Sequence, residues 1–480
     1  MNVMKETLLR EVFRTEEIMR QRDPQRWRMR FHIMPPAGWL NDPNGLCFYD
    51  GNYHFFFQYA PFDVDGGLKM WGQYCSKDLV HWEYAGTPIL PDSPYDCHGV
   101  YSGCAFTEDG RMELFYTGNI KLDGDYDYTN NGRESNTIYI SSADGNVYGD
   151  KECLLGMDDY PAEYTNHIRD PKVWKEDGSY FMVLGGRRKD GQGAVLLYRS
   201  GDKKVWKYMQ ELTTEKSFGY MWECPDLFSL DGERILSVSP QGLAKEEYRF
   251  QNIYQSGYFL LPENFLERKV SEEFTEWDLG FDFYAPQTFS DASGRRILVG
   301  WAGMPDCEDD YQNPTALDGW QHVFTIPRRL SWNGKKVCQY PVSEINALRR
   351  ECKEFTGGQW QTQHMDSCFD WEVIDPDKDG FRITIEKECV IQYEKGIFSL
   401  EFTGELGAGR TIRKALIDSV QNVRILADTS LLEVFINEGE HVFTTRYYPR
   451  GETRILTYTG GGRSCLWSLC RENCIDWKRN

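Results

Sequence analysis

The sequence predicts an all-β fold with two domains, a five-bladed β-propeller followed by a C-terminal β-sandwich. Three observations support this prediction. Helical periodicity is scarce after residue 30, where short alternating runs separated by Gly, Asp and Asn dominate. One hairpin signal recurs five times between residues 50 and 294. A second strand-rich region that lacks this repeat begins near residue 355.

Residues 1–30 are expected to form a helical extension, because Met4, Leu8, Val12 and Met19 fit one face of a short amphipathic helix. This segment is rich in charges and lacks the apolar core of a signal peptide. The 14 cysteines form no C-x-x-C pair and no short His/Cys cluster, so neither a zinc site nor a redox motif is expected. We therefore expect reduced thiols, a cytoplasmic location and no metal or other cofactor.

The propeller, expected over residues 31–342, is predicted from an internal repeat. A turn that begins with Asp and contains Gly precedes an alternating run at five places, and Asp-Gly in such a setting is a strong hairpin signal. The intervals between successive aspartates are 59, 68, 54 and 60 residues. Each unit is long enough for four strands, which favours five propeller blades. Five unrelated hairpins in a sandwich are the alternative.

The second domain is expected at residues 355–480, after a short linker at 343–354 with a brief helical pattern. Its six alternating runs fit a β-sandwich of about 120 residues. The sequence leaves open whether this domain binds sugar or assembles subunits, so a homo-oligomer is neither predicted nor excluded.

The composition favours a small-molecule substrate over a polyanion. The net charge of −20 argues against nucleic acid or an anionic membrane as the main partner, and no apolar run is long enough to cross a membrane. Aromatic residues make up 15% of the chain. Aromatic rings stack on sugars, but they also favour strands, so this composition is only suggestive of sugar binding.

Three acids occupy the same place in the repeat. Asp42, Asp170 and Glu223 each precede a hairpin turn by seven or eight residues, in the segment expected to be the first strand of a blade. First strands line the central channel of a propeller, so the three carboxylates should converge there.

Converging carboxylates repel one another, so a fold keeps them where chemistry or a cation uses them. One interpretation is a glycosidase and the other is a divalent cation site. Calcium ligands are usually close together in sequence, whereas these acids are far apart and each has Pro nearby. A single Asp-Pro would indicate a turn, but three at equivalent positions favour a functional site.

A series of motifs runs in order from about residue 31 to residue 449. The segments are 31–36 (FHIMPP), 39–45 (WLNDPNG), 76–82 (SKDLVHW), 169–171 (RDP), 222–225 (WECP), 239–242 (SPQG), 282–287 (DFYAPQ) and 432–437 (LEVFIN). Together they resemble glycoside hydrolase family 32, which includes invertases, sucrose-6-phosphate hydrolases and fructan hydrolases. The resemblance implies a five-bladed propeller with a β-sandwich, as the repeat predicts.

The resemblance also implies roles for individual residues. It makes Asp42 the nucleophile, Glu223 the general acid/base and Asp170 a stabiliser of the transition state, in a retaining double displacement that releases fructose from β-D-fructofuranosides. The implied sugar contacts are Leu40, Asn41, Gln58, Trp71, Tyr101, Ser102 and Arg169. For Gln58 and Trp71, a packed strand residue is the alternative.

Two further expectations concern the surroundings of the acids. Apolar surroundings from Trp222 and Cys224 are expected to raise the pKa of Glu223, and Arg169 is expected to hold Asp170 charged.

The identity of the fructoside stays open among sucrose, sucrose 6-phosphate and short fructo-oligosaccharides. Without an export signal, the chain is most similar to sucrose-6-phosphate hydrolases. A phosphate on the glucosyl unit needs cations at the rim of the channel, and Arg187, Arg188 and Lys189 are candidates unless they are simply a solvated charge run.

The sequence departs from the family pattern at Ala60, Gln73 and 62–70, beside the expected pocket. The resemblance therefore implies hydrolysis but leaves the leaving-group preference open. A fructosyltransferase that uses the same acids is an alternative. A non-catalytic fructan-binding propeller would be expected to lack one of the three acids.

Overall fold

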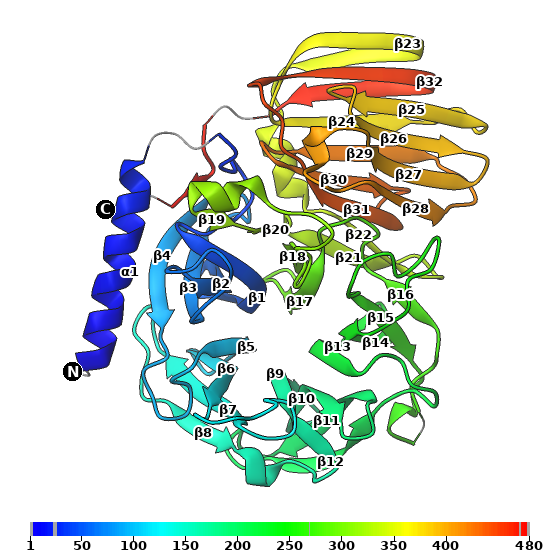
Figure 1. Ribbon diagram of the computed structural model, residues 1–480. Coiled ribbons are helices and arrows are strands. Elements are labelled where there is room, and N and C mark those ends of the chain that lie inside the picture. Colours follow the sequence, from blue (N-terminus) through cyan, green and yellow to red (C-terminus); the bar gives the residue numbers. More distant parts are fainter. Residues whose placement is uncertain (1–2, 23–25, 268, 470–471, 478–480) are drawn as a thin grey trace.

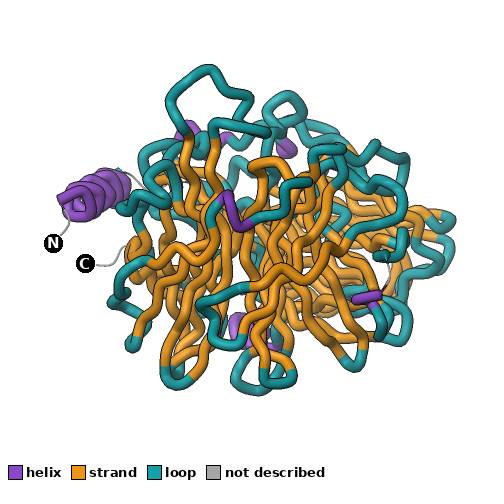
Figure 2. The backbone as a smooth tube through the Cα atoms, turned by 90° about the horizontal axis from the view of Figure 1, so that it is seen from below, coloured by secondary structure: helices purple, strands orange, loops and turns teal. Residues whose placement is uncertain are grey.

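The computed structural model describes residues 3–22, 26–267, 269–469 and 472–477. It is an all-β fold with one α-helix, α1 (Val3–Gln21), in the described part. Sheets arranged as a propeller form the larger part, and a sandwich-like sheet packs against one side of it (Figure 1). Loops gather at both ends of the propeller strands, and α1 lies outside them (Figure 2).

The first sheet has the order β19-β1-β2-β3-β4-β33. Its strands are β1 (Gly38–Tyr49), β2 (Asn52–Ala60), β3 (Met70–Ser76), β4 (Trp82–Ile89), β19 (Trp320–Gln321) and β33 (Ile475–Asp476). The two short strands pair in parallel at its edges, β19 beside β1 and β33 beside β4. Segments from late in the sequence thus attach to the sheet formed by the earliest strands.

The next three sheets are antiparallel and each has four strands. One contains β5 (Val100–Glu108), β6 (Arg111–Lys121), β7 (Arg133–Ser142) and β8 (Glu152–Leu155). Another contains β9 (Tyr164–Glu176), β10 (Ser179–Arg188), β11 (Gly193–Ser200) and β12 (Lys207–Leu212). The third contains β13 (Met221–Leu230), β14 (Glu233–Gln241), β15 (Gly257–Leu261) and β16 (Phe274–Glu276).

A further sheet contains β17 (Tyr284–Ser290), β18 (Arg296–Ala302), β20 (Val323–Phe324), β21 (Arg328–Trp332) and β22 (Val337–Pro341). The strands that begin these sheets pack against one another in sequence: β1 contacts β5, β5 contacts β9, β9 contacts β13, and β17 contacts both β13 and β1. The first strands therefore surround a common centre.

The predicted Asp-Gly hairpins are confirmed. In four of them, Asp and Gly are the two residues between paired strands, and both have positive φ, for example 47° at Asp177 and 72° at Gly178. This is the conformation of a type I′ turn, whose twist matches that of the flanking strands. The fifth turn is longer, and the Asp291 carboxylate accepts hydrogen bonds from the backbone of Ser293 and Arg295 within it.

The C-terminal part forms one continuous sandwich-like sheet rather than two separate ones. Its strands are β23 (Cys352–Asp366), β24 (Phe369–Ile374), β25 (Gly380–Ile385), β26 (Cys389–Glu394), β27 (Ile397–Phe402), β28 (Ile412–Leu416), β29 (Asn422–Ala427), β30 (Leu431–Ile436), β31 (His441–Arg446) and β32 (Thr453–Ser468). β32 pairs with β25 before Gly460 and with β24 after Gly462. Both glycines have positive φ, which lets one long strand serve both halves.

A buried network of charges joins the propeller to this sheet. Arg328 of β21 pairs with Glu433 of β30 and with Asp278, and none of the three side chains is exposed. His32 lies between Glu433 and Asp428, with ring nitrogens 2.9 and 2.8 Å from their oxygens. Paired charges without solvent tolerate little displacement, so this network fixes the two parts relative to each other.

Helix α1 packs with Val12 and Met19 buried, as expected, whereas Met4 is 52% exposed. The side chain of Glu16 is also buried and accepts hydrogen bonds from the hydroxyls of Tyr59 and Tyr84. Among the described residues, no helix combines the length and apolarity needed to cross a membrane.

Candidate active site

A β-bulge near the start of each first strand turns side chains toward the centre. The pairing shifts register between Asn41 and Pro43 in β1 and between Glu223 and Asp226 in β13. Equivalent shifts occur in β5, β9 and β17. A bulge bends a strand and redirects its side chains, and proline suits such a position because it has no N–H to pair.

The three predicted acids meet at this centre. The Sγ atom of Cys224 lies 3.8 Å from carboxylate oxygens of both Asp42 and Asp170. The Arg169 guanidinium lies 3.7 Å from Asp170 and 3.1 Å from Glu223. One thiol and one guanidinium thus connect three carboxyl groups that come from β1, β9 and β13.

A chain of hydrogen bonds ends at the Asp42 carboxylate. Trp39 Nε1 donates to Asn41 Oδ1 (2.7 Å), and Asn41 Nδ2 donates to Gln58 Oε1 (2.9 Å). Gln58 Nε2 donates to Ser102 Oγ (2.6 Å), whose hydroxyl donates to Asp42 Oδ2 (2.5 Å). Because Ser102 accepts from Gln58, its own proton points to Asp42. Three predicted contact residues, Asn41, Gln58 and Ser102, therefore act on the Asp42 carboxylate.

Burial raises the pKa of Asp42, and the nearby Glu223 charge raises it further. Hydrogen bonds from Ser102 and Asn41 oppose this rise because they stabilise the ionised form. A carboxylate with little water around it and few donors is a stronger nucleophile than a fully solvated one.

Asp170 lies in left-handed backbone with φ of 65°, which is uncommon for a residue other than Gly. Its N–H donates to Thr117 Oγ1, and its carboxylate accepts from the Cys224 N–H at 3.0 Å. Burial raises the pKa of Asp170 to about 7, although Arg169 lowers it. Arg169 therefore favours the ionised form of Asp170, as expected, but the effect of burial is larger, and the closer contacts of the guanidinium are with Glu223.

Glu223 has polar partners on both carboxylate oxygens. Arg169 binds Oε1, while Gln241 Nε2 and the Tyr284 hydroxyl each donate to Oε2 at 2.7 Å. The expected apolar surroundings are absent: the Trp222 indole packs in a neighbouring hydrophobic cluster and donates to the Phe218 carbonyl. The bulge directs the carboxyl to the centre and the indole away from it.

The remaining predicted contacts are divided between the centre and the core. Leu40 and Trp71 are fully buried, and the Trp71 indole donates to the Tyr101 carbonyl at 3.1 Å. Trp71 packs on Phe56 and Tyr116, which agrees with the alternative of a packed strand residue. The Tyr101 side chain is partly exposed and interacts electrostatically with Arg169.

Sequence reasoning assigned no role to Gln241 and Tyr284, the partners of Glu223. Both lie within motifs that resemble the family, 239–242 and 282–287, and this position is the sequence signal that could have identified them. Their contact with Glu223 links β13 to β14 and β17, which no local pattern predicts.

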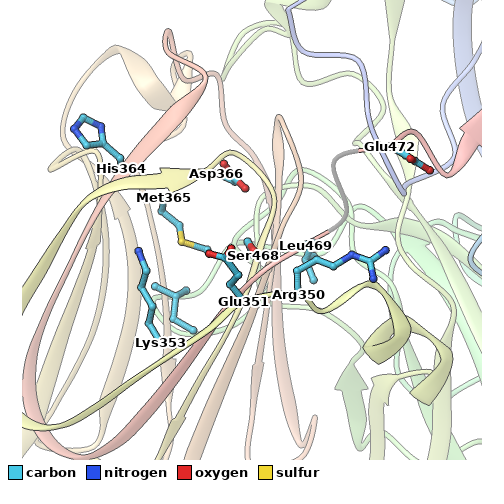
Figure 3. Close-up of a pocket in the computed structure, with 10 residues that line it drawn as sticks. Arg350, Glu351, Lys353, His364, Met365, Asp366, Ser468, Leu469 and Glu472 are labelled. Carbon is cyan, nitrogen blue, oxygen red and sulfur yellow. The ribbon is translucent and has the colours of Figure 1, made fainter.

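The described residues contain no group of three or more His, Cys, Asp or Glu side chains placed to hold a metal ion. A separate cavity of about 700 Å³ lies beside β23 and β32 and contains none of the predicted site residues (Figure 3). Its lining residues are Arg350, Glu351, Lys353, His364, Met365, Asp366, Leu466, Ser468, Leu469 and Glu472.

Comparison with known families gives two matches. The N-terminal domain of glycosyl hydrolases family 32 matches residues 32–341, and the C-terminal domain of the same family matches residues 386–468. The first match alone covers more than half of the chain.

Among curated proteins, the chain is 39% identical to the sucrose-6-phosphate hydrolase of Bacillus subtilis (strain 168), over 92% of this chain and 94% of that one. It is 35% identical to the raffinose invertase of Escherichia coli, over 92% of this chain and 94% of that one.

Among solved structures, a sucrose-6-phosphate hydrolase from Lactobacillus gasseri superposes with a TM-score of 0.85, at 27% identity and 96% coverage of both chains. A mutant of a Bombyx mori GH32 beta-fructofuranosidase in complex with sucrose gives 0.84, at 29% identity, covering 98% of this chain and 99% of that one.

Proposed function

The chain belongs to glycosyl hydrolase family 32, and from that premise we propose that it hydrolyses sucrose or sucrose 6-phosphate and releases fructose. It is a β-fructofuranosidase. The observation that carries the proposal is the meeting of Asp42, Asp170 and Glu223 around Cys224 and Arg169. Two carboxyl groups suffice for a retaining double displacement, and the third can hold the sugar.

In the proposed mechanism, the Asp42 carboxylate attacks the anomeric carbon of the fructosyl unit and forms a covalent intermediate. Glu223 donates a proton to the departing glycosidic oxygen and then removes one from the attacking water. Ser102 fixes the orientation of Asp42 through its 2.5 Å hydrogen bond. Asp170 and Arg169 hold hydroxyl groups of the fructosyl unit during both steps.

The proposed sugar contacts differ in how much the geometry supports them. Asn41, Gln58 and Ser102 form the chain that ends at Asp42, and Tyr101 and Arg169 stand beside it. Leu40 and Trp71 are fully buried, so we propose that they support the pocket by packing behind the residues that contact the sugar.

We further propose that the propeller has five blades and spans residues 31–342, between a helical extension (1–30) and a linker (343–354) that leads to the sandwich (355–480). Support comes from the mutual contacts of β1, β5, β9, β13 and β17, each the first strand of its sheet.

A cytoplasmic location is part of the proposal. Each cysteine that the structure describes is a free thiol, as is usual in a reducing compartment. The relatives named sucrose-6-phosphate hydrolase are consistent with a substrate that is phosphorylated inside the cell.

The test is to incubate the purified protein with sucrose and with sucrose 6-phosphate and to measure free fructose. Release of fructose from at least one substrate is expected, with the anomeric configuration initially retained in the product. Absence of fructose from both substrates, with a folded protein, would contradict the proposal. Prolonged chelator treatment should leave the rate unchanged.

A further inference from the structure

Basic side chains surround His167, next to the catalytic acid/base position. His167 lies in β9, two residues before Arg169. The Asn166 amide donates to the Arg133 carbonyl at the start of β7 (2.7 Å), and the Thr165 hydroxyl donates to the Arg187 carbonyl at the end of β10 (3.0 Å). These backbone contacts place Arg133 and Arg187 on either side of the segment that carries His167.

Two of the three arginines here lack an acidic partner. Arg169 is paired with Glu223. For Arg133 and Arg187, no carboxylate within 4 Å is found among the described residues, and Arg133 Nε is buried without a hydrogen-bond partner. Arg187 lies over the Tyr220 ring, 4.8 Å from its centroid. The positive charges of these two arginines are therefore available to a bound anion.

The neighbours of Arg187 in sequence have different surroundings. Arg188 pairs with Glu211 at 2.5 Å and with Asp190 at 3.0 Å. Lys189 donates to the Ala162 carbonyl at 2.7 Å. Of the three cations that the sequence suggested for a phosphate, Arg187 is therefore the one for which no ion pair and no side-chain hydrogen bond is found among the described residues.

His167 itself is held neutral. Its Nε2 is 3.0 Å from the Tyr128 carbonyl and donates to it, so Nδ1 accepts from Arg169 Nη1 at 2.9 Å. Burial, together with the charges of Arg169, Arg133 and Arg187, lowers the pKa of His167 to about 3. The same positive potential that disfavours a protonated histidine favours a bound anion.

The position of the arginines around His167, relative to the glycosidic bond that is broken, indicates which part of the substrate they contact. Arg133 interacts electrostatically with Tyr101, Arg169 and Glu223. Glu223 is the proposed proton donor to the departing sugar, whereas Asp42 attacks from the side of the fructosyl unit. Arg133 therefore lies on the leaving-group side, and Arg187 acts on the same His167 ring as Arg133 does.

We propose that Arg133 and Arg187 bind a phosphate monoester carried by the leaving-group sugar, and that they give this enzyme its preference for a phosphorylated β-fructofuranoside. This inference rests on the proposed function. Guanidinium groups bind phosphate oxygens through paired, charge-assisted hydrogen bonds. Bound phosphate would neutralise the two arginines and supply an acceptor for Arg133 Nε.

The test compares kcat/KM for sucrose 6-phosphate and for sucrose in the parent and in Arg133→Gln, Arg187→Gln and Arg188→Gln. The parent should prefer the phosphorylated substrate. The first two variants should each lower that preference by about 10- to 100-fold, mainly through KM of sucrose 6-phosphate. Arg188→Gln is the matched control, because its guanidinium is already paired, and its preference should equal that of the parent.

A binding measurement separates failure of this inference from failure of the proposed function. The Kd of glucose 6-phosphate should rise in Arg133→Gln and Arg187→Gln by the same factor, whether or not the protein releases fructose. A parent that prefers sucrose, or variants that lose both substrates equally, would overturn the inference. If either Gln variant is misfolded by circular dichroism, Arg133→Lys and Arg187→Lys keep the charge and should retain part of the preference.

Discussion

At the scale of single residues, the site gives three carboxyl groups three different surroundings. Asp42 ends a chain of donors, Asp170 is buried beside the Cys224 N–H, and Glu223 is held by Arg169 and two neutral donors. Because burial, charge and hydrogen bonding each act on a carboxyl pKa, such differences separate the roles of otherwise similar groups.

The roles of Asp42 and Glu223 can be separated by changing the leaving group. Glu223→Gln should lower kcat/KM for sucrose by roughly 10²–10⁴-fold, because proton donation is lost. The fructosylation step of a nitrophenyl fructoside, whose leaving group needs little protonation, should be affected much less. Asp42→Asn should impair both substrates, since no leaving group replaces the nucleophile. The measurement is the variant-to-parent ratio of kcat/KM for each substrate. The opposite pattern would mean that the two roles are reversed.

The buried Asp170 should make stability depend on pH. Its pKa is raised to about 7 in the folded state from an ordinary value of 3.8, mainly by burial. Between about pH 4 and 7 the folded protein keeps a proton that the unfolded chain releases, so stability falls as the pH rises through this window. Asp170→Asn removes the free-energy cost of ionising this buried carboxyl group. Its gain in free energy of unfolding over the parent should be greater at pH 8 than at pH 5, by about 2.5 kcal/mol.

Urea denaturation of Asp170→Asn and the parent at both pH values measures this difference. Asp125→Asn, on an exposed loop, is the control and should change little at either pH. A gain that is equal at pH 5 and pH 8 would contradict the assignment of a raised pKa to Asp170.

At the scale of elements, each hairpin turn fixes where the first strand of a sheet ends and the second strand begins. Gly178 has φ of 72°, and a Cβ added there would meet nothing within 4 Å. Gly178→Ala should therefore destabilise by about 1 kcal/mol through backbone conformation alone. Gly201→Ala is the matched control, because its added Cβ also meets nothing and its φ is not positive.

The control should be neutral or slightly stabilising, since Ala restricts the unfolded chain more than Gly does. Chemical denaturation of both variants gives the comparison. Equal effects at the two positions would argue against the strained type I′ turn.

At the scale of the whole molecule, the charge network at Glu433 joins the two parts. Its carboxylate faces Arg328, His32 and the Ile326 N–H, and it is not exposed. Glu433→Gln places N–H donors against those donors and leaves buried cations short of an acceptor. We expect a loss of about 3–5 kcal/mol in the free energy of unfolding.

The control for this change is Glu272→Gln, in an ion pair with Lys216 whose side chains are 47% and 82% exposed. An exposed pair contributes about 1 kcal/mol or less, so the control should change stability little. Denaturation followed by both tryptophan fluorescence and circular dichroism provides the measurement. Similar small effects for both variants would show that the junction does not depend on its buried charges.

The sequence by itself determined the features that follow local rules. Asp-Gly between alternating runs dictated the hairpins, because positive φ at two adjacent residues is a local property. The place of Asp42, Asp170 and Glu223 before those turns, together with the repeat, predicted that they meet. The family motifs supplied the chemistry.

The partners of each acid were decided only by the tertiary structure. Arg169 is adjacent to Asp170 in sequence, but its closer contact is with Glu223, 54 residues away, and Tyr284 reaches Glu223 over 61 residues. Likewise, Arg188 is neutralised by acids and Arg187 is not, although the two are neighbours. The physical reason is that bulges and the packing of successive sheets set the direction of each side chain, and those contacts depend on how distant strands close around one centre.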